Sequence, residues 1–138
     1  MTAKEYLEQA RKLDDRIDTK IQYLEYLNCL ATKCTSVMSH APHGGSNQKG
    51  LDVTIAKIID LENEINADID KLVELKAEIT RVVAQVVDPN QRMILEKRYL
   101  CRMMWEDICY ELNYGIARMK QIHQSAIAAV EVILSAKE

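Results

Sequence analysis

The segment that decides the fold is residues 99–130, which read YLCRMMWEDICYELNYGIARMKQIHQSAIAAV. Apolar residues at helical spacing flank a short break at Asn113-Tyr114-Gly115. The pattern predicts a helix of about seven residues, a tight turn and a second amphipathic helix. This is the layout of a helix-turn-helix, a motif whose second helix usually enters the major groove of DNA.

The two predicted helices have distinct inner and outer faces. Residues three and four apart share a face, so the inner face holds Trp105, Ile108 and Leu112 in the first helix, and Met119, Ile122 and Ala126 in the second. A basic side chain on the outer face can contact phosphate or guanine, and a glutamine can pair with adenine. The pattern therefore predicts a DNA-binding face made of Ala117, Arg118, Lys120, Gln121 and Gln124. A helix face that is merely solvated has the same pattern.

A new domain is predicted to begin at residue 88. Asp88 is suited to cap a helix, Pro89 fits the first helical position, and Gln91 stands where a capping box has Glu or Gln. We expect a helix from Pro89 to Arg102 that leads into the helix-turn-helix. Its core candidates are Met93, Ile94, Leu95, Tyr99 and Leu100.

Residues 1–87 are expected to form a long antiparallel helical hairpin with a coiled-coil-like seam. The first seam consists of Tyr6, Ala10, Leu13, Ile17, Leu24, Leu27, Ala31, Cys34 and Met38, with a polar gap at Lys20. The second consists of Leu51, Ile55, Ile58, Ile65, Ile69, Leu72, Ile79, Val83 and Val86, and the opposite face carries Asp60, Glu64, Asp68, Lys71 and Glu78. Residues 39–50 are rich in Gly and small polar residues and are expected to form the loop. The apolar stripes are too wide for a lone hairpin, so we expect either a homodimer with a four-helix arrangement or packing of the hairpin against the C-terminal domain.

The composition points to an all-α protein. The 138 residues are 48% hydrophobic and include four Gly, two Pro and no Phe. No apolar run is long enough to cross a membrane, and the first residues lack the apolar core of a signal peptide, so we expect a cytoplasmic protein with no membrane association.

The charge and the polar residues limit the function classes. Residues 1–90 carry 11 basic against 15 acidic residues, and residues 91–138 carry 7 against 6, so the chain lacks the basic footprint of a strong nucleic-acid binder. Any affinity for DNA would have to come from a local patch, from doubling in a dimer or from a partner. No catalytic arrangement or phosphate loop is present, and we expect neither an enzyme nor a cofactor. Cys29, Cys34, His40 and His43 lack the spacing of a zinc site, so no metal is predicted.

A family resemblance rests on the C-terminal third of the chain. Leu95-Glu96-Lys97-Arg98-Tyr99-Leu100, Trp105-Glu106-Asp107-Ile108 and the residues Glu111, Leu112, Tyr114, Met119, Ile122 and Ala126 resemble the region-4 module of bacterial sigma factors. With the N-terminal arm, the whole chain looks like small phage and prophage transcription regulators, akin to the ArpU and RinA activators. Relatives usually have Ser or Thr where this chain has Met104 and Gly115.

Two functional hypotheses follow from these observations. The resemblance implies a regulator of phage or prophage transcription whose C-terminal domain binds double-stranded DNA, with RNA polymerase as a second expected partner. In this hypothesis the helical hairpin forms a homodimer and spaces two such domains. The acidic arm and the small number of basic residues on the outer face favour a second hypothesis. In that case the molecule is a protein-binding module that docks on a host protein, such as RNA polymerase or a defence nuclease, with little DNA binding of its own.

Overall fold

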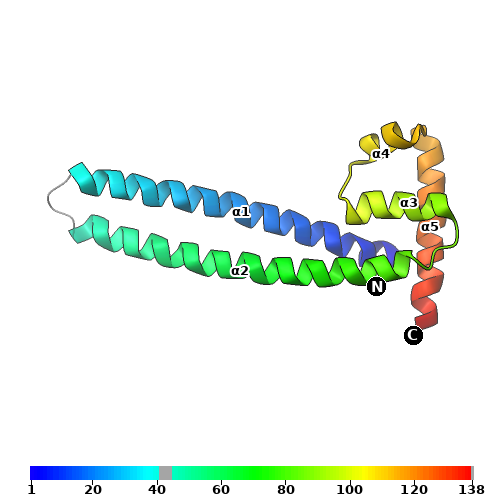
Figure 1. Ribbon diagram of the computed structural model, residues 1–138, viewed down its shortest axis with the longest axis horizontal. Coiled ribbons are helices and arrows are strands. Elements are labelled where there is room, and N and C mark those ends of the chain that lie inside the picture. Colours follow the sequence, from blue (N-terminus) through cyan, green and yellow to red (C-terminus); the bar gives the residue numbers. More distant parts are fainter. Residues whose placement is uncertain (41–44, 138) are drawn as a thin grey trace. The chain divides into compact units, whose positions relative to one another are not determined.

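The computed structural model describes residues 1–40 and 45–137, and the side chains of residues 1–33 and 49–137 (Figure 1). Over these residues it has helices and no strand, which confirms the all-α class. The elements are α1 (Ala3–His40), α2 (Gly45–Val83), α3 (Pro89–Leu95), the π-helix η1 (Glu96–Leu100), α4 (Trp105–Leu112) and α5 (Ile116–Lys137). None of the described helices is apolar over a stretch long enough to cross a membrane.

Part of the expected loop over residues 39–50 is helical in the structure, and residues 41–44 lie outside the described residues. α1 continues to His40 and α2 begins at Gly45, so residues 45–50 are helical. A long helix grows cooperatively from its packed part, and this outweighs a glycine penalty of about 1 kcal/mol near its end. The glycine content of this segment therefore failed to predict that residues 45–50 are helical.

The chain divides into two compact units, each described by itself. The head unit comprises Met1–Leu13 and Leu72–Glu138, and the hairpin unit comprises Asp14–Lys71. The head unit thus includes the first turns of α1 and the last turns of α2 in addition to the elements that follow residue 88.

In the hairpin unit, α1 and α2 run antiparallel and side by side (Figure 1). Their seam contains the buried residues Ile17, Leu27, Ile58, Leu61 and Ile65. Along α2 the buried positions step by three and four from Ile58 to residue 68, which is the spacing of a heptad seam.

That spacing corrects the expectation for Asp68 and Ile69. Asp68 was placed on the solvent face, but it is buried with 8% of its surface exposed, whereas the predicted seam residue Ile69 is 39% exposed and Ile55 is also exposed. The reason is the partner across the seam. Lys20, which looked like a polar gap, donates a hydrogen bond from Nζ to Asp68 Oδ2 at 2.6 Å, and this ion pair replaces one apolar layer.

The head unit anchors the start of α1. Thr2 and Glu5 form a reciprocal capping box, in which Thr2 N donates to Glu5 Oε2 at 3.0 Å and Glu5 N donates to Thr2 Oγ1 at 3.2 Å. The next amide, Ala3 N, donates to Glu131 Oε2 of α5 at 2.8 Å. Ala3 and Leu7 are fully buried, so the first turns of α1 belong to the head core.

The helix that follows residue 88 begins as expected and ends earlier. Asp88 caps α3 and accepts hydrogen bonds from Asn90 N at 2.8 Å and Gln91 N at 3.5 Å. Met93, a core candidate, is 42% exposed, because it lies about 200° around the helix from the fully buried Leu95 and so faces away from the core.

The helical stretch was expected to end at about Arg102, and it ends two residues earlier, at Leu100. The wider turn of η1 ends at Leu100, and Cys101 N closes it by donating to Glu96 O at 2.9 Å. Arg102 then adopts a left-handed conformation with φ 65°, which no helix accommodates.

Candidate nucleic-acid interface

α4 and α5 pack as a helix-turn-helix around a small apolar core. The buried members of this core are Ile94, Ile108, Met119 and Ile122, and the half-buried side chains against it are Met103, Trp105, Cys109, Leu112 and Tyr114. Five of the six predicted inner-face residues therefore lie in or against this core, and the sixth, Ala126, is fully buried. The sequence frame therefore predicted the inside of the motif correctly.

The turn between the two helices depends on Asn113. Asn113 has φ 56° and ψ 39°, the left-handed conformation that ends a helix, and asparagine tolerates it better than most residues. Tyr114 N donates to Cys109 O at 3.0 Å and closes the turn. Gly115 precedes α5, and its carbonyl accepts from Met119 N at 3.0 Å, the first hydrogen bond of that helix. At the start of α4, the side chain of Met104 carries no oxygen that could accept a hydrogen bond from the free amides of the first turn.

The five predicted DNA-binding residues share the exposed side of α5. Each is solvent-exposed in the structure: Ala117, Arg118, Lys120, Gln121 and Gln124. A shallow polar hollow extends this side toward the start of α3, where Asn90 and Gln91, together with the carboxylate of Asp88, lie beside Arg118 and Gln121. The structure thus brings the predicted residues together on one surface and adds two amide side chains that sequence reasoning did not include.

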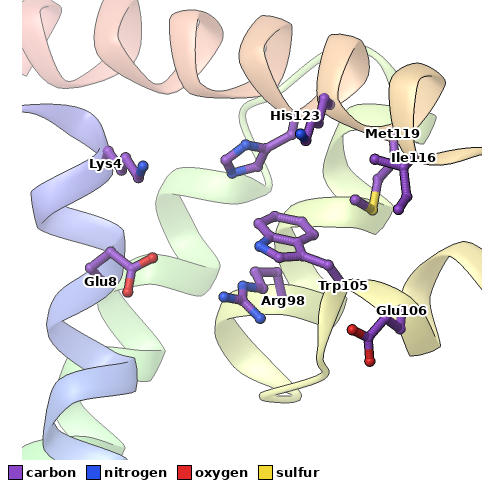
Figure 2. A pocket seen from close by; sticks show the side chains of 9 residues that line it. Lys4, Glu8, Arg98, Trp105, Glu106, Ile116, Met119 and His123 are labelled. Carbon is purple, nitrogen blue, oxygen red and sulfur yellow. The ribbon is translucent and has the colours of Figure 1, made fainter.

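A cluster of four side chains, which we term the tryptophan cluster, positions α5 against the preceding elements. The guanidinium of Arg98 stacks 4.3 Å from the centre of the Trp105 ring, and His123 meets the same ring edge-on at 4.6 Å. The Tyr99 hydroxyl and His123 Nε2 share a hydrogen bond of 2.8 Å. Trp105 lies between Arg98 and His123 (Figure 2).

Burial in the tryptophan cluster shifts the pKa values of His123 and Tyr99. Burial, followed by the positive charges of Lys4 and Arg98, lowers the pKa of His123 from 6.5 to about 4. Burial likewise raises the pKa of Tyr99 to about 12. The histidine is therefore neutral at physiological pH and acts as a hydrogen-bonding part of the core.

The head unit is expected to lose stability between pH 7 and pH 5. Because the folded pKa of His123 lies below that of free histidine, the unfolded chain takes up a proton that the folded chain does not. The free energy of unfolding should fall by about 1–2 kcal/mol over this range, because His123 is only partly shielded from solvent. Urea unfolding followed by Trp105 fluorescence measures it, since Trp105 is the single tryptophan.

His123→Gln provides the control for this pH dependence. It removes the titrating ring, so the free energy of unfolding should fall much less between pH 7 and pH 5. The small fall that remains comes from other titratable groups. An equal drop in the variant and the parent would contradict the assignment to His123.

The sulfur and imidazole groups form no metal centre in the part of the chain that is described. No group of three or more His, Cys, Asp or Glu residues lies close enough together there to hold a metal ion. Cys29 is exposed and free. The other members of the considered zinc set, Cys34, His40 and His43, lie outside the residues whose side chains are described.

One family model matches most of the chain. A model described as "Protein of unknown function (DUF1492)" matches residues 30–131, well over half of the chain. The chain belongs to this family. The match takes in α2, α3, η1, α4 and most of α5, so the complete helix-turn-helix falls inside the family region. No curated protein and no solved structure matches the chain.

Proposed function

We propose that this DUF1492 protein is a regulator of phage or prophage transcription that binds double-stranded DNA through the exposed side of α5. The observation that carries the proposal is the arrangement of α4 and α5. A packed helix-turn-helix core holds α5 so that Arg118, Lys120 and Gln121 all face solvent. In proteins with this motif, the second helix enters the major groove. The likeness of residues 95–126 to sigma region 4 supports the same reading.

The charges indicate how such binding would work. Arg118 and Lys120 are the two cations among the five predicted residues, so one copy has few phosphate contacts. The start of α4 presents Glu106 and Asp107 to solvent, which repels phosphate on that side. We expect modest affinity that falls steeply with salt and that depends on the glutamines for base recognition.

Arg118→Ala combined with Lys120→Ala should weaken DNA binding at least about tenfold and reduce the slope of log K against log salt concentration by about 2. Fluorescence anisotropy with a duplex taken from the DNA beside the protein's own gene measures both quantities. Lys49→Ala combined with Lys57→Ala is the matched control, because it removes two exposed cations from the hairpin unit. Equal loss in the two double variants, or no binding by the parent, contradicts the proposal.

A protein-docking role is the second candidate. Three large apolar side chains are exposed on or beside α4: Met104, Tyr110 and Ile116 are 60%, 85% and 59% exposed. Exposed apolar side chains suit protein contacts better than DNA contacts. Such a module would contact RNA polymerase or another host protein and would show no salt-dependent binding to DNA.

We also propose that the hairpin unit forms a homodimer. Its outer sides expose an unusual number of large apolar residues: Ile21, Tyr23, Tyr26, Val53, Ile55, Ile59 and Ile69. Ile55 and Ile59 are one helical turn apart, as the anchors of a helix–helix contact are. Pairing two hairpins would bury this surface and would double the number of DNA contacts.

Light scattering should give a mass near twice the 15.8 kDa of one chain at high protein concentration. Ile55→Glu combined with Ile59→Glu should return the mass to that of one chain while leaving the helical circular dichroism signal intact. A parent that stays at the mass of one chain up to about 100 µM would refute the dimer.

A further inference from the structure

A cavity of about 440 Å³ lies in the head unit beside the tryptophan cluster. Its walls come from the first turns of α1, from η1, from the start of α4 and from α5 (Figure 2). This volume falls in the range of small-molecule sites, and such sites combine apolar walls with a few converging polar groups. Neither the packing of the helix-turn-helix core nor the predicted DNA-binding face requires a cavity at this place.

The apolar part of the wall is formed by Trp105, Ile116 and Met119. Trp105 lies near the centre of the view, and Lys4 and Glu8 lie to its left on α1 (Figure 2). An indole ring flanked by a methionine thioether and an isoleucine favours a flat apolar ring as the occupant.

The charged part of the wall favours an anion. Three cations line the cavity, Lys4, Arg98 and Lys120, against the two carboxylates Glu8 and Glu106. Arg98 donates from Nη1 to Met103 O at 3.0 Å, and its Nε is buried without a hydrogen-bond partner among the residues that the structure describes. Burial, and after it the nearby Arg11 cation, lowers the pKa of Arg98, because a charged guanidinium is costly to hold away from water.

We propose that this cavity binds a small anion that carries an aromatic ring. The ring packs on Trp105, Ile116 and Met119, and the anionic group lies toward Lys4 and the guanidinium of Arg98. Glu8, on the same helix as Lys4, limits how much negative charge the site accepts. Lys120 lines the cavity and is also one of the predicted DNA-binding residues. The test of the site uses no DNA and leaves Lys120 intact, so its outcome is separate from that of the proposed function.

The indole N–H signal of Trp105 reports on this site directly, because the chain has one tryptophan. Benzoate and phenyl phosphate are the probes, one for a carboxylate ligand and one for a phosphate ligand, and benzylamine is the cationic counterpart. Titration into the full-length protein should move the indole signal saturably, with a dissociation constant on the order of 1 mM or below for at least one anion. The tighter anion identifies the ligand class.

Two variants with opposite expected effects make the test specific. Lys4→Gln should weaken anion binding about two- to fivefold, and Glu8→Gln should strengthen it by a similar factor. Lys12→Gln is the matched control, because Lys12 is exposed on α1 and does not line the cavity. Arg98 stays intact, since its removal would disturb the Trp105 reporter.

Three results would overturn the site. The first is an indole signal that does not move saturably with either anion up to about 20 mM, an affinity too weak for a built site. The second is binding of benzylamine as tight as that of the anions, which would indicate an unselective apolar hollow. The third is equal affinity in the Lys4→Gln and Lys12→Gln variants.

Discussion

Replacing Ile108 with alanine is expected to destabilise the head unit by about 3 kcal/mol, the effect of a large-to-small change in a packed core. Ile108 is fully buried, and its side chain joins α4 to Ile94 of α3 and to Met119 and Ile122 of α5. The helix-turn-helix core is small, so few neighbouring side chains can move in to fill the cavity. Urea unfolding followed by Trp105 fluorescence measures the change, because Trp105 packs against this core.

Tyr110→Ala is the matched control for this prediction. Tyr110 lies on the same helix two residues away and is 85% exposed, so its loss should change stability by less than about 0.5 kcal/mol. Similar unfolding midpoints for the two variants would show that α4 does not pack as described. The Ile108 variant should also lose DNA binding in proportion to its unfolded fraction, which separates a structural effect from a lost contact.

Replacing Asp68 with alanine is expected to destabilise the hairpin unit by about 2 kcal/mol, because it leaves the Lys20 ammonium in the seam without its partner. The two side chains are 12% and 27% exposed, so the pair is more shielded than a surface ion pair but still partly solvated. The hydrogen bond from Lys20 lowers the pKa of Asp68, and this stability should therefore be present at neutral pH and be lost as the pH falls through that lowered value. Urea unfolding followed by circular dichroism measures the effect.

Two further variants test the Asp68 prediction. Glu64→Ala should change stability by less than about 0.5 kcal/mol, because Glu64 reaches the same Lys20 only at 3.9 Å and is 62% exposed. Lys20→Met combined with Asp68→Leu should recover most of the lost stability, since an apolar layer can replace a buried pair. Equal effects of Asp68→Ala and Glu64→Ala would contradict a buried role for this ion pair.

The features that the sequence predicted well depend on local patterns. The cap at Asp88, the turn at Asn113 and the inner face around Ile108 each follow from residues a few positions apart. The exposure of Arg118 and Lys120 follows from the same helical periodicity. Local propensity and tertiary packing agree at these positions.

The features that the sequence did not predict depend on contacts between residues that are far apart in the chain. The burial of Asp68 requires Lys20, which lies 48 positions earlier and looks like a simple gap in its own helix. The bond between Tyr99 and His123 joins residues 24 positions apart, and no spacing rule marks it. The π-helical turn that ends at Leu100 also has no local sequence signal, because it is fixed by closure onto Glu96 and by the Lys76 ammonium, which donates to Leu100 O at 3.1 Å.

The most direct test of the DNA-binding face is a nuclear magnetic resonance titration of the full-length protein with the duplex from beside its own gene. We expect the largest amide shifts along the exposed side of α5, at Ala117, Arg118, Lys120, Gln121 and Gln124. The amides of Asn90 and Gln91 at the start of α3 should move to a smaller extent, because their side chains share the polar hollow beside that face. Saturable binding that leaves the α5 amides unmoved, or no binding at low salt, would contradict the account.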